Sequence, residues 1–542
     1  MGAALTLLAA TLLPLAVVPQ SVRALSAVDR PGGDALLMIW NLWHVNQALS
    51  DGRNPLRTDL VYHPLGTGLA RHTYSPGFAP VSPLAERVWP GDPHNPIRAY
   101  RLAIWLSFSL AFACSHFFLQ RLGLDGLSSL APAILYAFSP FVRWNVGHLQ
   151  HLSAAFLAPL VGLLAVRAWH EPRASRLVAL GFVLGAGVYF GELIVFIGMA
   201  LGLAVLAALV LPSTRARVRE WFRSVRPAAL FAGVAAFVAT IAPFAAQWTS
   251  EGGRAPRYEQ SVYGSANVAG FAVPDPAMTP LYRRLLGDDR PRQRGVGGYA
   301  LFLGFPLLVL APVGLLVRPR EWAPIAGIAT AAVFVLSLGP ELKVGRVNTG
   351  WLLPYRVLME IPPLSMGRTP ANCALLVVLG TACLAARALH WLRHRVKAKA
   401  GRAWGVAFCA AFVLWAWLEV RAPGSPPPVY RRPGELDRLV PGAVANVPLS
   451  VFDGFAVFMQ TFHGQPILTG WVSRRSPEQL AHVRSLQALL DASPDAFVER
   501  ARELGATNVV LGPGTRPEVA EALLRTPINV VDLRGEASLV AR

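Results

Sequence analysis

The sequence predicts an all-α polytopic membrane protein that carries a small α/β domain at its C-terminal end. Of its 542 residues, 54% are hydrophobic and 15% are charged, and the mean hydropathy is +0.42. In a typical soluble domain, about a quarter of the residues are charged. Several runs of about twenty apolar residues follow one another, each long enough to cross a bilayer. We therefore expect a transmembrane domain over residues 1–420 and an extracytoplasmic domain over residues 421–542.

About eleven apolar segments are expected to cross the membrane. The first could instead be a signal peptide, because residues 24–27 resemble a cleavage site, but no basic segment precedes it and a retained span is favoured. The run 177–211 would form a helix about 52 Å long at ~1.5 Å per residue, so we expect a turn at Gly191 and Glu192. The expected spans are 3–19, 99–119, 124–141, 151–168, 177–190, 193–211, 228–248, 298–317, 322–339, 370–389 and 403–420.

Clusters of arginine set the expected orientation. They follow the fourth, sixth, eighth and tenth spans, so all of them lie on one face of the membrane. The positive-inside rule assigns that face to the cytoplasm, which places the N-terminus inside and the C-terminal domain outside. The net charge of +19 is concentrated beside the spans, so a topology signal explains it better than nucleic-acid binding does. The long polar loops then share the outer face, an asymmetry that favours chemistry there over alternating-access transport.

The C-terminal segment alternates short strands and helices, as a small α/β domain near the minimum size for its own core would. We expect strands over 444–449, 508–511 and 528–533, and helices over 477–490, 494–504 and 517–524. Its polar residues Gln460, His463 and Arg474 could face the membrane domain or could serve only the local structure.

The first external loop, residues 28–98, is the longest polar interruption near the start of the chain. It begins with paired glycines and Asp34, and a tryptophan-rich run follows. At helical spacing Asp34, Asn41 and His44 share one side, which predicts an amphipathic helix lying in the membrane interface. Asp34 would stand at its N-terminus, where the helix dipole favours a negative charge. Taken alone, Asp34 could be a helix cap as well as a functional carboxylate.

The order of short motifs along the chain resembles the GT-C superfamily of integral-membrane glycosyltransferases. The likeness is to bacterial members akin to family 39 and to the RgtA/B/C/D-like domains, and it covers most of the chain. The matching stretches are Gly33-Asp34, Trp40-Asn41-Leu42-Trp43, Asn54-Pro55, Tyr62-His63-Pro64-Leu65-Gly66, Phe138-Ser139-Pro140-Phe141, Gly147-His148-Leu149, Phe271 to Pro276 with Gly298-Tyr299, Pro354-Tyr355-Arg356, Gly367-Arg368-Thr369-Pro370, and Gln460 with His463 to Pro466 and Gly470.

This resemblance implies a catalytic base and a donor. In the superfamily an acidic residue of the first external loop takes the proton of the acceptor, and the donor is a polyprenyl-phosphate sugar; Asp34 matches that position. A single base and a leaving phosphate imply direct displacement with inversion. Asp29, Asp51 and Asp59 share the loop, but none clearly pairs with Asp34. No cofactor is therefore implied with certainty, although a divalent metal could take part.

Further residues on the outer face are candidates for substrate binding. A lipid phosphate calls for arginine or histidine nearby. His148 and His151 are close enough to share a ligand, so a metal pair, a phosphate contact and an interface anchor all remain open. Glu192 is an acid inside an apolar run, which is costly and often functional, but it could equally be a polar turn residue. The full set is His63, Arg71, His72, Arg143, His148, His151, Glu192 and Arg368.

Together these observations predict a glycosyltransferase of the bacterial inner membrane. It would move a sugar, a hexose or a pentose, from a polyprenyl-phosphate carrier to a glycan, lipid or protein acceptor at the outer face. The alternative is a lipid or polysaccharide transporter, or a non-catalytic membrane protein with the same fold. The outer-face asymmetry favours the enzyme, and the missing acidic partner of Asp34 favours the alternative.

Overall fold

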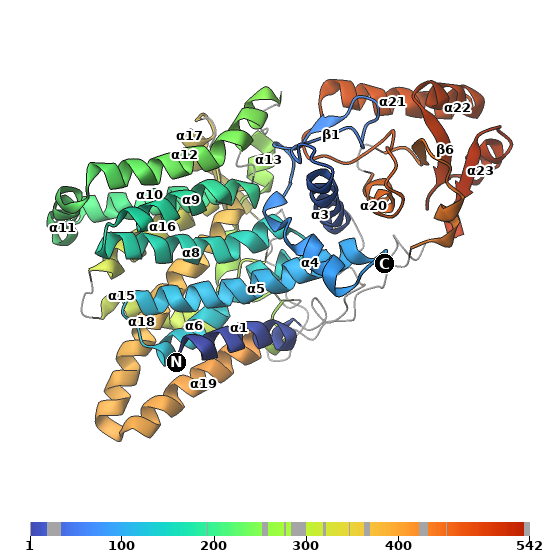
Figure 1. Cartoon of the computed structure of the whole chain (residues 1–542). Helices are drawn as coiled ribbons and strands as arrows, with labels where there is room; N and C mark the ends of the chain where they lie inside the picture. Colours follow the sequence, from blue (N-terminus) through green and yellow to red (C-terminus); the bar gives the residue numbers. More distant parts are fainter. Residues whose placement is uncertain are drawn as a thin grey trace.

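The longer helices gather into one bundle, and the C-terminal segment lies at one end of it (Figure 1). The computed structural model describes residues 2–18, 34–191, 193–251, 258–275, 278–282, 300–317, 321–345, 347–361, 369–421, 432–450 and 453–535. The bundle helices are α1 (Ala3–Val17), α5 (Asn95–Arg121), α6 (Gly126–Ala137), α8 (Leu149–His170), α9 (Ala174–Ala186), α10 (Ile194–Val210), α12 (Pro227–Ser250), α15 (Phe305–Leu316), α16 (Trp322–Ser337), α18 (Ala374–Ala400) and α19 (Arg402–Val420).

The bundle follows from the apolar runs. A helix satisfies its own backbone hydrogen bonds, which lipid cannot do, so an apolar segment in a bilayer becomes helical. Helix α8 and the helix over 370–400 are central, because 72% of the most apolar window of each is buried by protein. Helices α12 and α19 are peripheral, with 11% and 28% buried, and their remaining surface is left to face lipid.

The chain is a multi-pass membrane protein, but the count of eleven spans stays a prediction. Every expected segment contains a helix in the structure. Within the described ranges, five helices are long and apolar enough to cross a membrane alone, and α10 would add a sixth together with α11 (Pro212–Ser224), which is bent by 108° from it. Helices α1, α9, α15 and α16 are apolar but shorter.

The helical path is interrupted between α9 and α10, around the predicted turn, of which Glu192 lies outside the described residues. The helical path ends with the short η2 (Gly187–Tyr189), and α10 begins at Ile194. Helix α9 also packs very closely on α12: a Cβ atom on Gly181 would collide with the carbonyl oxygen of Gly233. Small residues allow such backbone approach between membrane helices, where there is little hydrophobic drive for association.

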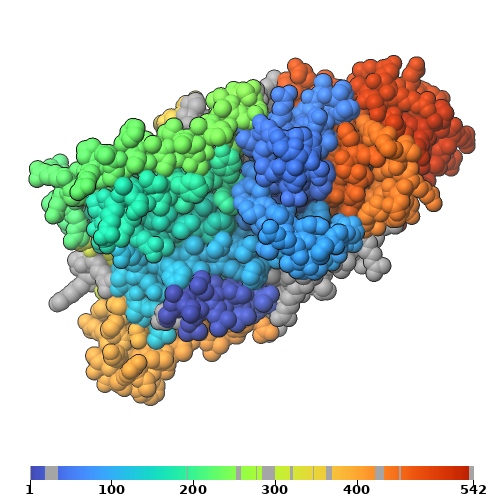
Figure 2. All heavy atoms as spheres, viewed as in Figure 1, coloured from blue at the N-terminus to red at the C-terminus, as the bar shows by residue number. Residues whose placement is uncertain are grey.

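The first external loop lies between the bundle and the C-terminal segment (Figure 2). It contains α3 (Asp34–Ser50), the hairpin β1 (Arg57–Thr58) and β2 (Thr67–Gly68), η1 (Pro76–Phe78) and α4 (Val81–Val88). Helix α3 differs from the amphipathic interfacial helix expected. Residues 35–42 are all buried, because α5 and α20 (Gly454–His463) cover different sides of α3. The remaining outer elements are α7 (Pro140–Trp144), α13 (Tyr258–Tyr263), η3 (Val268–Phe271), β3 (Glu341–Val344), β4 (Val347–Leu352), α17 (Tyr355–Leu358) and η5 (Pro370–Cys373).

The C-terminal segment folds around a parallel sheet of three strands. Its order is β5 (Ala443–Val447), β6 (Ala506–Leu511) and β7 (Asn529–Asp532), with Val447 opposite Leu511 and Leu511 opposite Asp532. The connections run through α20, α21 (Pro477–Ala492), α22 (Pro494–Glu503) and α23 (Pro517–Leu524), and η6 (Gly434–Arg438) precedes the sheet. The expected strands and helices are found to within two residues at every end, whereas α20 was not predicted.

The boundary between the two predicted domains is not sharp in the packing. Leu486, Phe497 and Leu511 belong to a separate core under the sheet. Phe458 and Met459 of α20, however, join the core that continues into the membrane bundle. The division into 1–420 and 421–542 therefore stays a prediction, since α20 packs with α3 of the first loop.

Candidate active site

Asp34 and His148 meet on the side of the bundle that faces the C-terminal segment. Asp34 is the first residue of α3, and His148 directly precedes the first residue of α8. The fold thus brings together two residues that are 114 positions apart in the sequence. His148 Nε2 lies 2.5 Å from Asp34 Oδ2. Both side chains are reachable from solvent, with 31% of His148 and 45% of Asp34 exposed. A carboxylate in the first turn of a helix is favoured by the helix dipole, so the position suits an ionised aspartate.

The contact gives Asp34 a fixed orientation. When Nε2 of His148 carries a proton, it donates this proton in a hydrogen bond to the Asp34 carboxylate. The short distance between the two atoms is typical of a charge-assisted bond. Nδ1 of His148 is buried and has no hydrogen-bond partner among the residues that the structure describes. Chemically, an exposed carboxylate held by a histidine can accept a proton from an incoming hydroxyl group.

His151 stands beside this pair. Its ring meets that of His148 edge to face, with the centroids 5.2 Å apart. His151 Nε2 lies 3.1 Å from Oδ1 of Asn372, a buried residue of η5 at the head of α18. The two Nε2 atoms therefore point to different partners, Asp34 and Asn372. This arrangement differs from two imidazoles that turn the same nitrogen to one ligand.

Asn372 is the residue of this group that the sequence analysis missed. The available signal was weak: Asn372 is a polar residue at the start of an apolar run, two positions after the Gly367 to Pro370 motif. In the structure it is 3% exposed and joins the central helix α18 to the His151 side chain. The carboxylate, the two histidines and this amide thus come from three elements: α3, α8 and η5.

His72 fixes α3 from the loop side. The backbone N–H of Ser473 donates to His72 Nδ1 at 2.9 Å, so Nε2 carries the proton and donates to Asn41 Oδ1 at 3.2 Å. Asn41 in turn donates to the carbonyl oxygen of Thr73 at 2.8 Å. His72 is 9% exposed. These contacts favour a positioning role for His72, joining α3 to the C-terminal segment, over contact with a substrate.

Arg71 holds the same loop to the end of α12. Its guanidinium lies 3.9 Å above the ring of Trp248, and Nε donates to the Trp248 carbonyl oxygen at 2.9 Å. The Glu251 carboxylate accepts from the backbone N–H groups of Ala70 at 3.1 Å and Arg71 at 3.0 Å. Both partners of the Arg71 side chain are on Trp248, so its contacts are those of an anchor between the loop and the bundle.

The remaining residues predicted to bind substrate either lie away from Asp34 or are not among the residues that the structure describes. The His63 backbone N–H donates to the Ile467 carbonyl oxygen, and its ring faces Gly505. Arg143 is 6% exposed; its guanidinium donates to the Phe138 carbonyl oxygen at 2.9 Å and to the Met278 carbonyl oxygen. No contact in the structure joins either side chain to the Asp34–His148 pair among the described residues. Glu192 and Arg368 lie outside the described residues.

A second group of ionisable side chains lies far along the bundle, at the other end of α18. Asp125, His390 and His394 place possible metal-ligand atoms within 4.8 Å of one another. The Asp125 carboxylate is already engaged: it caps α6 through Leu127 and Ser128, and it accepts from Arg393 at 2.5 Å and from His390 at 2.8 Å. With both oxygens used, the group is a helix cap and ion-pair cluster that ties α6 to α18.

The comparisons with known proteins concern the fold. No family model and none of the curated proteins match the sequence. Among solved structures, the oligosaccharyltransferase AglB from Archaeoglobus fulgidus, in complex with an inhibitory peptide and a dolichol-phosphate, matches with a TM-score of 0.50 and 11% identity, over 94% of this chain and 69% of AglB. ArnT from Cupriavidus metallidurans, bound to undecaprenyl phosphate, matches with a TM-score of 0.47 and 12% identity, over 90% of this chain and 93% of ArnT.

Both proteins belong to the GT-C superfamily of membrane glycosyltransferases. The likeness to AglB extends over almost the whole chain, and it confirms the fold that the order of the sequence motifs predicts. At this low identity the comparison speaks for the fold alone, and the reaction has to be argued from the site.

Proposed function

We propose that this chain, which has the GT-C fold, is a membrane glycosyltransferase that uses Asp34 as its general base. The donor is a sugar on a polyprenyl phosphate, and the acceptor is a hydroxyl or similar nucleophile of a glycan, lipid or protein. The observation that carries the proposal is the contact of 2.5 Å between His148 Nε2 and Asp34 Oδ2, on a carboxylate that is 45% exposed. A residue with only a capping role would not need a histidine partner from another helix.

The proposed step is a single displacement. The Asp34 carboxylate takes the proton of the acceptor as the acceptor oxygen bonds to the anomeric carbon. The bond between that carbon and the phosphate oxygen breaks, the phosphate leaves with the electron pair, and the anomeric configuration inverts. His148 keeps the carboxylate oriented through Oδ2. Orientation of this kind matters because a misplaced base loses much of its catalytic effect.

The packing around α3 supports this use of Asp34. Trp40 Nε1–H donates to Gln460 Oε1 at 2.7 Å, and Gln460 Nε2 donates to the Leu60 carbonyl oxygen at 2.7 Å. His44 Nδ1 lies 3.1 Å from the Tyr74 hydroxyl group. Helix α3 is thus fastened at several points, and the carboxylate at its first residue stands on a rigid support, as a catalytic group requires.

His151 and Asn372 are proposed to complete the site. Asn372 Oδ1 accepts from the Nε2–H of His151 and so sets the orientation of its ring, and His151 is proposed to border the acceptor. A divalent metal could assist the leaving phosphate, although the described groups around Asp34 include one carboxylate and two histidines whose Nε2 atoms face different partners. Arg71 and His72 are proposed as positioning residues, because their contacts hold the loop.

The location follows from the expected orientation. The site lies on the side of the bundle next to the C-terminal segment (Figure 1), and the arginine clusters assign the opposite side to the cytoplasm. The proposal therefore places the reaction at the outer face of a bacterial inner membrane.

The decisive experiment separates transfer from transport. The purified protein is placed in liposomes with radiolabelled undecaprenyl-phosphate sugar and a panel of glycan, lipid and peptide acceptors. The proposal predicts a new glycosidic product that the Asp34→Asn variant, present at equal amount, does not form. Movement of the labelled lipid across the bilayer, without any glycosidic product, would support the transporter alternative instead.

A further inference from the structure

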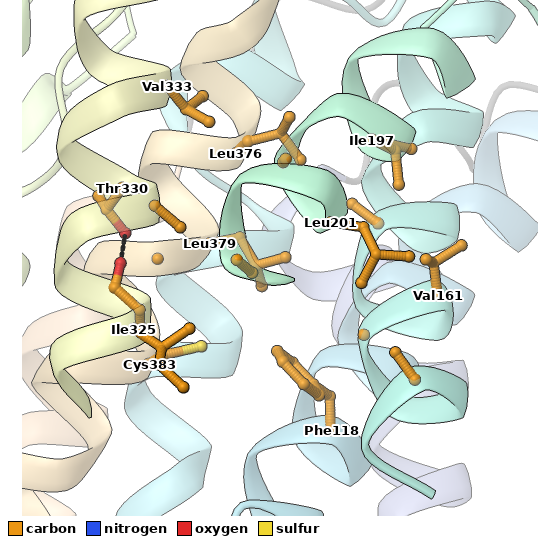
Figure 3. A pocket seen from close by; sticks show the side chains of 18 of the residues that line it. Phe118, Val161, Ile197, Leu201, Ile325, Thr330, Val333, Leu376, Leu379 and Cys383 are labelled. Carbon is orange, nitrogen blue, oxygen red and sulfur yellow. Dashed lines mark hydrogen bonds between the residues drawn. The ribbon is translucent and has the colours of Figure 1, made fainter. Parts of the chain in front are cut away.

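A cavity that is lined by none of the proposed catalytic residues opens within the membrane bundle. It has a volume of about 240 Å³ and lies between α5, α8, α10, α16 and α18, as Figure 3 shows. Its wall is almost wholly apolar; Phe118, Val161, Leu201, Ile325 and Leu379 point into it. An apolar cavity of this size does not hold water well and instead takes up apolar ligands.

Along α8 the residues that line the cavity run from Ala158, seven residues after His151, to Val166. His151 is in the first turn of α8, whereas Val166 lines the far part of the cavity. Fifteen residues of helix separate the two, which is about 22 Å at ~1.5 Å per residue. None of the described lining residues is a proposed catalytic or positioning residue, although Leu376 lies about one turn after Asn372.

The apolar cavity continues into a polar mouth. A neighbouring cavity of about 290 Å³ shares four lining residues with it: Leu122, Val166, Trp322 and Ile325. The neighbouring cavity adds Arg121, His170, Arg217 and Glu321 to its wall. Two guanidinium groups face one carboxylate there, so the mouth keeps one net positive charge and favours an anion. An apolar cavity with a positively charged mouth matches a lipid with an acidic headgroup.

The surroundings of the mouth point to the membrane surface. Helix α11 follows α10 at an angle of 108°. Its Trp221 donates through Nε1 to the Ala168 carbonyl oxygen at 3.1 Å, while Arg215, Arg219 and Arg223 are exposed. A basic amphipathic helix across the end of a span is typical of the headgroup region of an anionic leaflet. Figure 1 shows α11 at the end of the bundle away from the C-terminal segment, and α11 itself carries one of the arginine clusters.

We propose that the apolar cavity and its mouth, together called the slot, hold an anionic phospholipid from the leaflet on the arginine-rich face. One acyl chain fills the apolar cavity, and the phosphate group lies in the mouth at Arg121 and Arg217. Arg217 is also paired with Glu321, which keeps its guanidinium at the entrance. Arg121 ends α5 and supplies the second positive charge. Bound in this way, the lipid would join α5, α8, α10 and α16 on one side of the molecule.

The test is native mass spectrometry of the full-length protein with defined lipids. Phosphatidylglycerol and phosphatidylcholine of equal chain length are titrated into the detergent-solubilised protein. We expect one phosphatidylglycerol to bind with clear preference. Arg121→Gln should weaken it about fivefold, the effect of one surface cation on an anionic lipid. The matched control is Arg215→Gln, which removes an equal charge from the exposed face of α11 without touching the cavities.

Two further variants test the acyl-chain slot. Ala204→Phe and Ala329→Phe fill it from opposite walls, α10 and α16, and either folded variant should lose the bound lipid while keeping the wild-type elution volume. Equal binding of phosphatidylcholine, or wild-type binding by the Arg121 and both filling variants, would overturn the proposal. Displacement of phosphatidylglycerol by equimolar undecaprenyl phosphate would also overturn it, because the slot would then belong to a polyprenyl carrier.

Discussion

Gln460 is the side chain whose loss should most directly loosen the helix that carries Asp34. It accepts from Trp40 Nε1–H at 2.7 Å and donates to the carbonyl oxygens of Leu60 at 2.7 Å and Gln465 at 2.9 Å. Gln460→Leu keeps the shape and removes all three bonds. The Leu60 oxygen still accepts from the Ile467 N–H, but Trp40 is fully buried and its indole N–H is left without a partner.

The magnitude follows from these partners. An orphaned buried donor costs about 1–3 kcal/mol, and each of the other two bonds contributes about 1 kcal/mol. We expect Gln460→Leu to lower the free energy of unfolding by about 3–5 kcal/mol. Denaturant titration in detergent, followed by tryptophan fluorescence, measures it. Gln487→Leu is the control, since Gln487 makes one exposed bond to Asp491, and it should change the free energy by less than about 0.5 kcal/mol.

A double-mutant cycle isolates the indole bond. In a Trp40→Phe background the orphaned donor no longer exists, so Gln460→Leu should cost less there by about 1–3 kcal/mol. Equal losses from Gln460→Leu and Gln487→Leu, or a cycle that closes without coupling, would refute the idea that Gln460 fastens α3 to the C-terminal segment.

Two other predictions concern stability. Burial, with a smaller effect of Arg53, lowers the pKa of His44 from 6.5 to about 4. The neutral ring therefore stabilises the fold fully above pH 6.5. This contribution to the free energy of unfolding is lost as the pH falls from 6.5 to 4. The free-energy difference between wild type and His44→Phe should shrink by up to about 3 kcal/mol over that range, and a constant difference in denaturant titrations would contradict it. Gly181→Ala should lower the free energy of unfolding by about 1–3 kcal/mol through overpacking against Gly233. The control Gly198→Ala should not lower it, because its added methyl group meets open space. Equal effects of the two variants in thermal unfolding would contradict the close contact between α9 and α12.

Local patterns in the sequence predicted the helices and strands well. Hydrophobic runs placed a helix in every expected span, and α21, α22 and α23 each begin at a proline. The break between Tyr189 and Ile194 followed from length, because one helix of that run would overshoot the bilayer, and Gly191 with Glu192 marked its expected place. These features depend on neighbouring residues, so a single sequence contains them.

The packing partners of α3 could not be predicted in the same way. Periodicity indicated a helix with a polar side, but burial on its other sides comes from α20, about 420 residues later in the chain. The tautomer of His72 likewise depends on Ser473, 401 residues away. Such contacts are set by the tertiary fold, and no local pattern specifies them.

The candidate site was predicted in part. The resemblance singled out Asp34, and the orientation placed His148 and His151 on the same face, but nothing in the sequence paired His148 Nε2 with Asp34. Asn372 was hidden because it begins an apolar run. Arg143 had looked available for phosphate, yet its guanidinium is occupied by backbone carbonyl groups. Charge and motif identify candidates, whereas burial decides which of them can meet a substrate.

The central claim is that Asp34 is the base and that His148 orients it. The most direct measurement is the single-turnover rate of sugar transfer from undecaprenyl-phosphate donor by wild type, Asp34→Asn, His148→Gln and the control Asp59→Asn, an exposed aspartate of the same loop. We expect Asp34→Asn to lose at least about 10²-fold in rate, His148→Gln to lose less, and Asp59→Asn to match wild type. Full transfer by correctly folded Asp34→Asn would contradict the account.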